Sequence, residues 1–206
     1  MKFHVMHVPR FINQKSAYGE DRATTCVGEA RHCTGCGRSI SMLEWLPPYE
    51  INVSQKNLGD FVYGTYSGLI ISKKVKEIFE KFKLKGMSNF KLVKLFNRGR
   101  VLNVEYYYPD ITFVNAFVDT DLLNLEGVDS CETCQLGARE LNGIDGIVFL
   151  QPDKIHEDVF FPSVFGQGVI VISERFKRII DEHSLSNVKL IEAEFYKWDA
   201  LSPSSF

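Results

Sequence analysis

The sequence predicts an α/β or α+β protein made of two related strand-helix-strand halves, held together by a four-cysteine zinc site. Three observations predict this fold class. Two segments repeat the same order of a β-branched apolar run and an amphipathic stretch. A Cys-x-x-Cys pair precedes each of these segments at a similar distance. Hydrophobic residues make up 45% of the 206-residue chain and charged residues 24%, so it can bury a core and is not disordered.

The repeated segment runs from Gly68 to Leu95 in the first copy and from Gly168 to Glu194 in the second. Each copy begins with an isoleucine- and valine-rich run that is typical of a buried strand. Ser72 and Ser173 follow these runs, where a helix N-cap is expected, and the apolar spacing behind each serine predicts a helix with its apolar face in the core. Renewed alternation predicts a returning strand. Aligning the copies requires an insertion at 85–87.

We interpret the repeat as a tandem duplication. The first half, 1–100, and the second half, 101–206, then each contain one cysteine pair and one strand-helix-strand unit, within one compact two-lobed domain. The segment that joins them alternates apolar and polar residues around Pro109. This pattern predicts a hairpin or a bent strand pair.

The two cysteine pairs together supply four thiols, at Cys33, Cys36, Cys131 and Cys134. Four thiolates are the ligand set of a closed, tetrahedral structural zinc site, and the ligands must be close in space but not in sequence. A pseudo-twofold arrangement of the halves would bring one pair from each half together. Such a site has no open position for water, so we expect one zinc ion that is structural and not catalytic.

Features around the cysteines leave alternatives open. Gly37 favours a tight turn after the first pair, whereas Gln135 stands at the matching place after the second. The pairs could also be thiols without metal, or a thioredoxin-like redox dithiol. Cys26 is expected to be a free thiol, and His32 could replace a ligand if the second pair is incomplete. His4 and His7 are expected on opposite faces of a strand, so they do not form a metal pair.

Charge is unevenly distributed along a chain whose formal net charge is only -2. From Lys73 to Arg100 there are ten Lys and Arg residues against two Glu. From Asp119 to Asp145 there are seven acidic residues against one Arg. Solvated faces explain most such runs, but an acidic surface can also attract a basic protein partner. The candidate partner-binding residues are Asp119, Asp121, Glu126, Asp129, Glu132, Glu140 and Asp145.

Several function classes are disfavoured. No hydrolase, metalloprotease, phosphate-loop or deaminase motif occurs, so we do not expect an enzyme. No window approaches 18 consecutive apolar residues, and the beginning of the chain lacks a signal-peptide pattern. Five cysteines without a secretory signal favour a reducing compartment, so we expect a cytoplasmic protein. The slightly negative net charge counts against nucleic acid as a partner.

The chain resembles the double-CXXCG motif proteins, a family first noted in myxobacteria, some of which are immunity proteins of toxin–immunity pairs. The resemblance rests on "CTGCG" at Cys33–Gly37, the second pair at Cys131–Cys134, and the segment from Glu157 to Glu194. That last segment is also similar to a wider group of bacterial immunity proteins. The second motif departs from the family pattern because Gln135 replaces the expected glycine.

The resemblance implies an intracellular protein that binds and neutralises a cognate polymorphic toxin, with zinc held by the four cysteines. The alternative is a zinc-stabilised nucleic-acid-binding regulator that uses the Lys73–Arg100 basic lobe. A thiol oxidoreductase is a third possibility.

Overall fold

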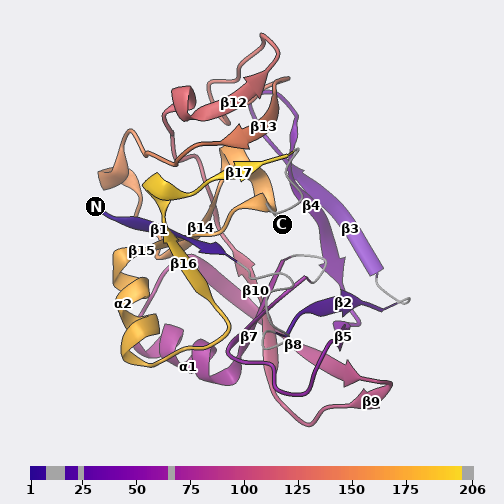
Figure 1. Cartoon of the computed structure of the whole chain (residues 1–206). Helices are drawn as coiled ribbons and strands as arrows, with labels where there is room; N and C mark the ends of the chain where they lie inside the picture. Colours follow the sequence, from indigo (N-terminus) through magenta and orange to yellow (C-terminus); the bar gives the residue numbers. More distant parts are fainter. Residues whose placement is uncertain (8–16, 23–25, 65–67, 201–206) are drawn as a thin grey trace.

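The computed structural model describes residues 1–7, 17–22, 26–64 and 68–200, and the structural statements below refer to these residues (Figure 1). The strands in chain order are β1 (Phe3–His7), β2 (Gly19–Asp21), β3 (Cys26–His32), β4 (Ser39–Leu46), β5 (Glu50–Val53), β6 (Phe61–Tyr63), β7 (Leu69–Ser72), β8 (Met87–Asn97), β9 (Arg100–Val101), β10 (Tyr106–Ile111), β11 (Phe113–Val114), β12 (Leu123–Glu126), β13 (Glu140–Ile144), β14 (Val159–Pro162), β15 (Val171–Ser173), β16 (Lys189–Glu192) and β17 (Trp198–Asp199). Two α-helices, α1 (Lys73–Lys81) and α2 (Glu174–Glu182), and four short 3₁₀ helices, η1 (Thr120–Leu122), η2 (Pro152–Lys154), η3 (Ser163–Gly168) and η4 (Ala193–Phe195), complete the described part of the chain.

Two four-stranded units with the same strand arrangement form the centre of the molecule. The first unit has the spatial order β6-β7-β10-β8, and the second has β14-β15-β1-β16. Every neighbouring pair in both units is antiparallel. In each unit a nine-residue helix links the second strand of this order to the fourth. The first sheet is extended by β2, β5 and β9, and the second by β11.

The third strand in the spatial order of the second unit comes from the other end of the chain. In the first unit this strand is β10, which follows β8 after the short β9, but in the second unit β1 occupies the equivalent place between β15 and β16. The backbone contacts correspond: the first residue of each helix donates its N–H to the carbonyl just before this strand, Lys73 to Glu105 and Glu174 to Lys2. Residue 100 is therefore not a boundary between the two sheets.

Both helices begin as the sequence predicts. The Ser72 Oγ accepts a hydrogen bond from the Val75 N–H, and the Ser173 Oγ accepts one from the Phe176 N–H. These N-caps satisfy one of the otherwise unpaired N–H groups of each first turn.

An aspartate supports each of these N-caps. The Ser72 hydroxyl donates to Asp60 at 2.9 Å, and the Ser173 hydroxyl donates to Asp158 at 2.7 Å. Asp60 also accepts from the N–H of Ser186, after α2, and Asp158 accepts from the N–H of Lys85, after α1. Each aspartate thus ties the start of its own helix to the turn after the other helix.

The turns after the two helices correspond without an insertion. Lys83 and Ser184 have φ values of 49° and 48°, and the next residue in each turn, Leu84 or Leu185, donates its N–H to a carbonyl of the preceding helix. The next two positions also correspond, because Lys85 and Ser186 each donate an N–H to one of the cap-supporting aspartates, and Gly86 and Asn187 both have positive φ. The insertion expected at 85–87 is therefore not present in these turns. The copies diverge only beyond them, where β8 has 11 residues and β16 has four.

The apolar faces of both helices meet in one core. Val75, Ile78 and Phe79 of α1 and Phe176, Ile179 and Ile180 of α2 belong to the same buried cluster. The rings of Phe79 and Phe176 meet edge to face at 5.9 Å between centroids. This confirms the prediction that the helix faces are core, and the shared core joins the two units.

Two outer cores lie on the far faces of the units. One contains Trp45, Ile70 and Leu95 on the first sheet, and the other contains Val5, Val171 and three of the four paired cysteines. The two-stranded ribbon β3–β4 connects these cores, because Trp45 lies in the first and Ile40, at the other end of β4, packs on the second. The ribbon therefore carries the first cysteine pair to the second half of the molecule (Figure 1).

The segment around Pro109 forms one bent strand and not a hairpin. β10 pairs with β8 on both sides of Pro109, and the register shifts between Tyr108 and Asp110. Proline cannot donate a ladder hydrogen bond, so an irregularity of this kind is expected where it enters a sheet.

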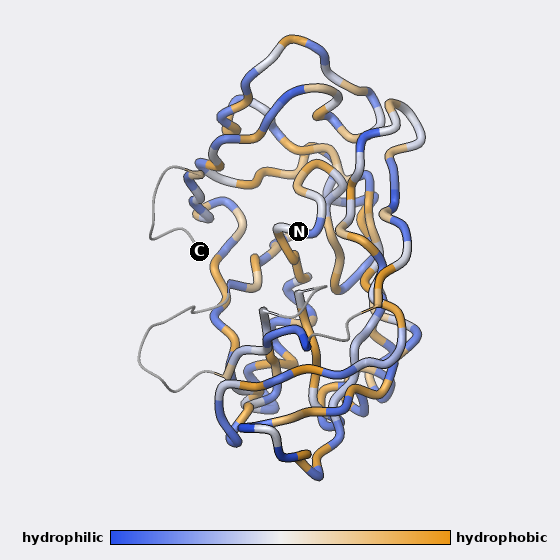
Figure 2. The backbone as a smooth tube through the Cα atoms, turned by 90° about the vertical axis from the view of Figure 1, so that its right-hand side faces the viewer, coloured by the Kyte–Doolittle hydropathy of each residue, from blue (hydrophilic) through white to orange (hydrophobic). Residues whose placement is uncertain are grey.

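The fold is strand-rich and mixed, with few helical residues. Most neighbouring strands are antiparallel, with β5–β8 and β11–β14 as parallel pairs. The α/β class requires mainly parallel sheets, so it does not describe this protein, and α+β describes it only loosely. Apolar and polar stretches alternate along the described part of the backbone (Figure 2). Among the described residues, no helix combines the length and apolar character that crossing a membrane requires.

Candidate metal centre

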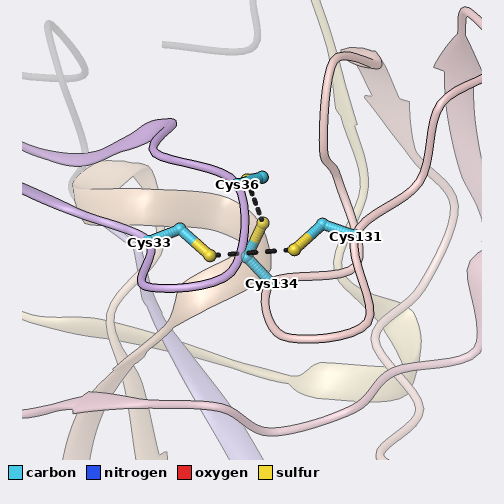
Figure 3. Close-up of side chains that lie close together, drawn as sticks. All are labelled: Cys33, Cys36, Cys131 and Cys134. Atoms are coloured by element: carbon cyan, nitrogen blue, oxygen red, sulfur yellow. Dashed lines mark hydrogen bonds between the residues drawn. The ribbon is translucent and has the colours of Figure 1, made fainter.

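The four cysteines of the two pairs meet at one point. Cys33 and Cys36 lie at the tip of the β3–β4 ribbon, and Cys131 and Cys134 lie in the loop between β12 and β13. Their side chains converge from the two loops (Figure 3), and all four Sγ atoms lie within 4.8 Å of one another. This confirms the prediction that the two pairs, one from each half of the sequence, come together and could hold a metal ion.

The sulfur geometry fits a tetrahedral metal. The Cys33 and Cys131 Sγ atoms are 3.8 Å apart, as are those of Cys36 and Cys134. A regular tetrahedron with Zn–S bonds of about 2.3 Å has sulfur–sulfur edges of about 3.8 Å. A disulfide would bring two sulfurs to about 2.05 Å, and all four cysteines are free thiols. Cys33, Cys131 and Cys134 are buried, whereas Cys36 is exposed.

Each cysteine pair lies in a tight turn, here called a knuckle: Cys33–Gly37 is the first and Cys131–Gln135 the second. The first knuckle depends on glycine for its turn and for its contact with the second. The Gly37 N–H donates to the Cys33 carbonyl at 2.8 Å, with Gly37 at φ 74°. A Cβ on Gly35 would lie 2.5 Å from the Thr133 Oγ1 and 3.1 Å from the Cys131 Sγ. Any larger residue at position 35 would therefore push the two loops apart.

The second knuckle forms the same turn without the expected glycine. Gln135 donates its N–H to the Cys131 carbonyl at 2.8 Å and has φ 63°, a conformation that is uncommon for residues other than glycine. Its side-chain amide accepts from the Val118 N–H and donates to the Val118 carbonyl, both at 2.8 Å. These two hydrogen bonds offset the cost of the left-handed backbone, so the departure from the family pattern does not disrupt the turn.

Arg38 joins the two knuckles, and sequence reasoning did not identify it. Its guanidinium donates to the Gly137 carbonyl at 3.0 Å and to the Arg139 carbonyl at 2.5 Å. Gly137 has φ 62°, and a Cβ there would lie 2.5 Å from the Asp129 carbonyl oxygen. The available signals were an arginine directly after the first motif and a glycine two residues beyond Gln135.

The local backbone prepares one of the sulfurs for ionisation. The N–H groups of Cys134 and Thr133 point toward the Cys131 sulfur and lower the pKa of that thiol to about 6. For Cys36, the Arg38 N–H lowers the pKa, but desolvation and hydrogen bonds from the other three sulfurs outweigh it and raise the pKa to about 12. The thiolate-prone sulfur is thus a buried one, which suits a metal ligand better than an exposed redox nucleophile.

The other candidate ligands lie outside the cluster. Cys26 pairs with Leu46 at the end of the ribbon opposite the knuckle, and His32 is not among the clustered ligand atoms. His4 and His7 lie on opposite faces of β1, as predicted. The buried His4 ring contacts the Glu174 carboxylate at 2.7 Å, and burial, with the Lys189 charge adding to it, lowers the pKa of His7.

The seven acidic candidate residues form two groups on the β12–β13 hairpin and its flanks. Asp119, Asp121 and Asp145 lie near η1, since Asp145 donates its N–H to the Leu122 carbonyl. Glu126, Asp129, Glu132 and Glu140 lie at the end of the hairpin that carries the second knuckle. All but Asp119 are exposed.

The knuckle end of this hairpin concentrates negative charge. Glu126 and Glu140 are directly opposite each other across the strands. Like charges at such positions destabilise a sheet. Among the described residues, the acidic candidates form one ion pair with a basic side chain, Asp145 with Lys197 at 3.5 Å. Val128, between Glu126 and Asp129, is 94% exposed.

No protein-family model matches this chain, and no curated protein matches it. The site is therefore interpreted from its own geometry.

Proposed function

We propose that this protein is an immunity protein that binds a cognate bacterial toxin in the cytoplasm and neutralises it by direct contact, without catalysis. The observation that carries the proposal is the knuckle end of the β12–β13 hairpin. There the opposed Glu126 and Glu140 are kept together on the surface at a cost to stability, and neither pairs with a basic side chain in the described part of the chain. A basic partner would relieve that repulsion on binding. The resemblance to double-CXXCG proteins supports a toxin as that partner.

The exposed Val128 gives this surface an apolar centre. Binding energy usually comes from a few apolar or aromatic contacts that are surrounded by polar residues. Val128 is 94% exposed and has Glu126 and Asp129 close to it in sequence. The surface would thus attract a basic toxin by charge and hold it by an apolar contact.

The test is protection of cells that express the toxin encoded beside this gene. The double variant Glu126→Lys/Glu140→Lys reverses the opposed pair and is expected to abolish protection. The matched control Asp153→Lys/Glu182→Lys makes the same charge change at exposed sites elsewhere and is expected to protect fully. Circular dichroism and metal content must match the wild type in both variants. Full protection by the folded Glu126→Lys/Glu140→Lys protein would remove this surface from the proposal.

We further propose that the four cysteines hold one structural zinc ion. Cys33, Cys36, Cys131 and Cys134 would bind it as thiolates and leave no open coordination position, so its role would be to fasten the ribbon to the hairpin. Iron can also be bound by four thiolates. Elemental analysis of protein purified without chelator is expected to find about one zinc per chain; one iron per chain, or no metal, would overturn this assignment.

The correspondence of the two units supports a tandem duplication in the history of this chain. They share the strand order, a serine N-cap whose hydroxyl donates to an aspartate, and the turn after the helix. An alignment of relatives would test this origin. It would be refuted if residues 69–84 resembled residues 170–185 no more than unrelated strand-helix segments do.

A further inference from the structure

A hollow beside the turn between β8 and β9 is lined by three cations and, among the described residues, by no carboxylate. Its volume is about 530 Å³, within the range of small-molecule sites. It is lined by Ser54, Gln55, Lys56, Asn97, Arg98 and Arg100. It lies on the first sheet, away from the cysteine cluster and the acidic hairpin.

The walls of the hollow are fixed by the backbone. Asn97 and Arg100 are paired across the β8–β9 hairpin, and the two residues between them, Arg98 and Gly99, both have positive φ, 48° and 77°. This is the conformation of a tight type I′ turn, which suits the twist of the flanking strands. The buried Asn97 amide donates to the Val53 carbonyl at 2.8 Å, which fastens the hairpin to the end of β5 beside the other wall.

The three cations of the hollow have no acidic partner among the described residues. Lys56, Arg98 and Arg100 are exposed, and none of them forms an ion pair there. Other cations of the same basic segment are neutralised, for example Lys73 by Glu105 and Lys91 by Asp110. Lys81 and Lys83 also lack ion pairs in this part of the chain, but they lie at the end of α1 and line no part of the hollow.

The chemistry of the lining suits phosphate oxygens. Two guanidinium groups can each donate paired hydrogen bonds to an oxyanion, and Lys56 adds a third positive charge. The Ser54 Oγ accepts a hydrogen bond from the Tyr18 N–H at 3.1 Å, which leaves its O–H free to donate to a ligand. Among the described residues, the lining contains no aromatic ring on which a nucleic acid base could stack.

We propose that this hollow binds a small ligand with a diphosphate or polyphosphate group carrying two or more negative charges. The source could be free pyrophosphate or the phosphate end of a nucleotide, because the recognised chemistry is the same. The site lies outside the toxin-binding surface proposed above and does not depend on it.

Isothermal titration calorimetry of the full chain at low ionic strength tests this proposal. Pyrophosphate and ADP are expected to bind and to compete with each other, and adenosine is not expected to bind. Affinity for ADP equal to that for pyrophosphate would assign recognition to the phosphates alone, and clearly tighter ADP binding would assign the nucleotide as the ligand. Both outcomes support the site.

Charge reversal gives the decisive comparison. Arg98→Glu/Arg100→Glu is expected to weaken pyrophosphate binding by at least tenfold, because it replaces two charged hydrogen-bond donors with carboxylates that repel the phosphates. Lys81→Glu/Lys83→Glu makes the same change in net charge outside the hollow and is expected to retain binding. Thermal denaturation confirms that each variant is folded. Equal weakening in both variants, no binding of pyrophosphate by the wild type, or binding of a single-stranded oligonucleotide that pyrophosphate does not displace would overturn the proposal.

Discussion

The two four-stranded units have the same plan but complete it differently. The first unit takes its strands from one continuous segment, β6 to β10, whereas the second takes three strands from residues 159–192 and its third position in the sheet from β1. Equivalent positions in a fold can thus be filled from distant parts of a chain when the pairing edges are the same. The difference also joins distant parts of the chain, because β1 pairs with β15 and β16.

The cysteine knuckles make a second comparison of the same kind. In the first, Gly37 takes a left-handed backbone without steric cost, and in the second Gln135 takes it with the help of two side-chain hydrogen bonds to Val118. The same turn is therefore reached by two different means. A motif search that requires glycine would miss the second one.

The largest loss of stability is expected at the cysteine cluster, which joins the two knuckles. Cys131→Ser removes one of the four candidate ligands, and the structural zinc proposed above would provide about 10–16 kcal/mol of apparent binding free energy. We expect loss of stoichiometric metal and a fall in Tm greater than that of any other variant below. Cys26→Ser, at the far end of the ribbon, is the control and should keep the metal and lower Tm far less. Retention of full metal content by Cys131→Ser would contradict a four-thiolate site.

The next effect concerns the aspartates that link the units. Asp158→Ala is expected to lower the free energy of unfolding by about 3 kcal/mol, and Asp60→Ala by about 2 kcal/mol, since each leaves hydrogen-bond donors of both units without an acceptor. Asp158 should cost more because its side chain is 7% exposed against 13% for Asp60. Urea denaturation measures both. A change within about 0.5 kcal/mol for Asp158→Ala would show that the cross-unit contacts are unimportant.

A smaller effect is expected at the helix N-caps. Ser72→Ala and Ser173→Ala should each cost about 1 kcal/mol, because each removes the side-chain acceptor of a first-turn N–H. Similar values for the two would strengthen the equivalence of the units. Ser88→Ala, at an exposed position of β8, is the control and should be nearly neutral. The denaturant midpoints of the three variants are compared. An unchanged midpoint for Ser173→Ala would show that this N-cap does not stabilise the second unit.

The smallest effect is expected at the second knuckle. Gln135→Gly relieves the left-handed backbone but loses two hydrogen bonds to Val118, so the opposing contributions should leave a net loss below about 1 kcal/mol. Gln135→Ala keeps the backbone cost and also loses both hydrogen bonds, so it should be the less stable of the two. Thermal denaturation and the rate of metal loss to a chelator measure this order. The reverse order would show that the Val118 contact contributes little.

Local patterns in the sequence predicted the helices, their serine caps and the four candidate ligands. The helices and their caps depend on residues close in sequence. The four ligands could be predicted because two Cys-x-x-Cys pairs together form a known ligand set for a metal ion. The position of β1 in the second unit could not be predicted, because Phe3–His7 reads as an ordinary short strand and its partner is more than 160 residues away. The insertion at 85–87 was wrong because the alignment matched Ser88–Asn89 to Ser186–Asn187 by residue identity. The hydrogen bonds from the Lys85 N–H to Asp158 and from the Ser186 N–H to Asp60 match Lys85–Gly86 to that pair instead.

The place of β1 also constrains how the chain folds while it is being synthesised. Phe3–His7 is synthesised before β6 to β10, but its neighbours β15 and β16 follow only at residues 171–192. The first unit can assemble from β6 to β10 in the meantime, since its strands are close in sequence. The second sheet cannot, so until residues 171–192 are synthesised β1 has unpaired edges and the buried faces of Phe3, Val5 and Met6 are uncovered. A nascent chain of this protein would therefore be vulnerable to aggregation or to chaperone capture at β1, and would be released from that risk only when β15 and β16 can pair with it.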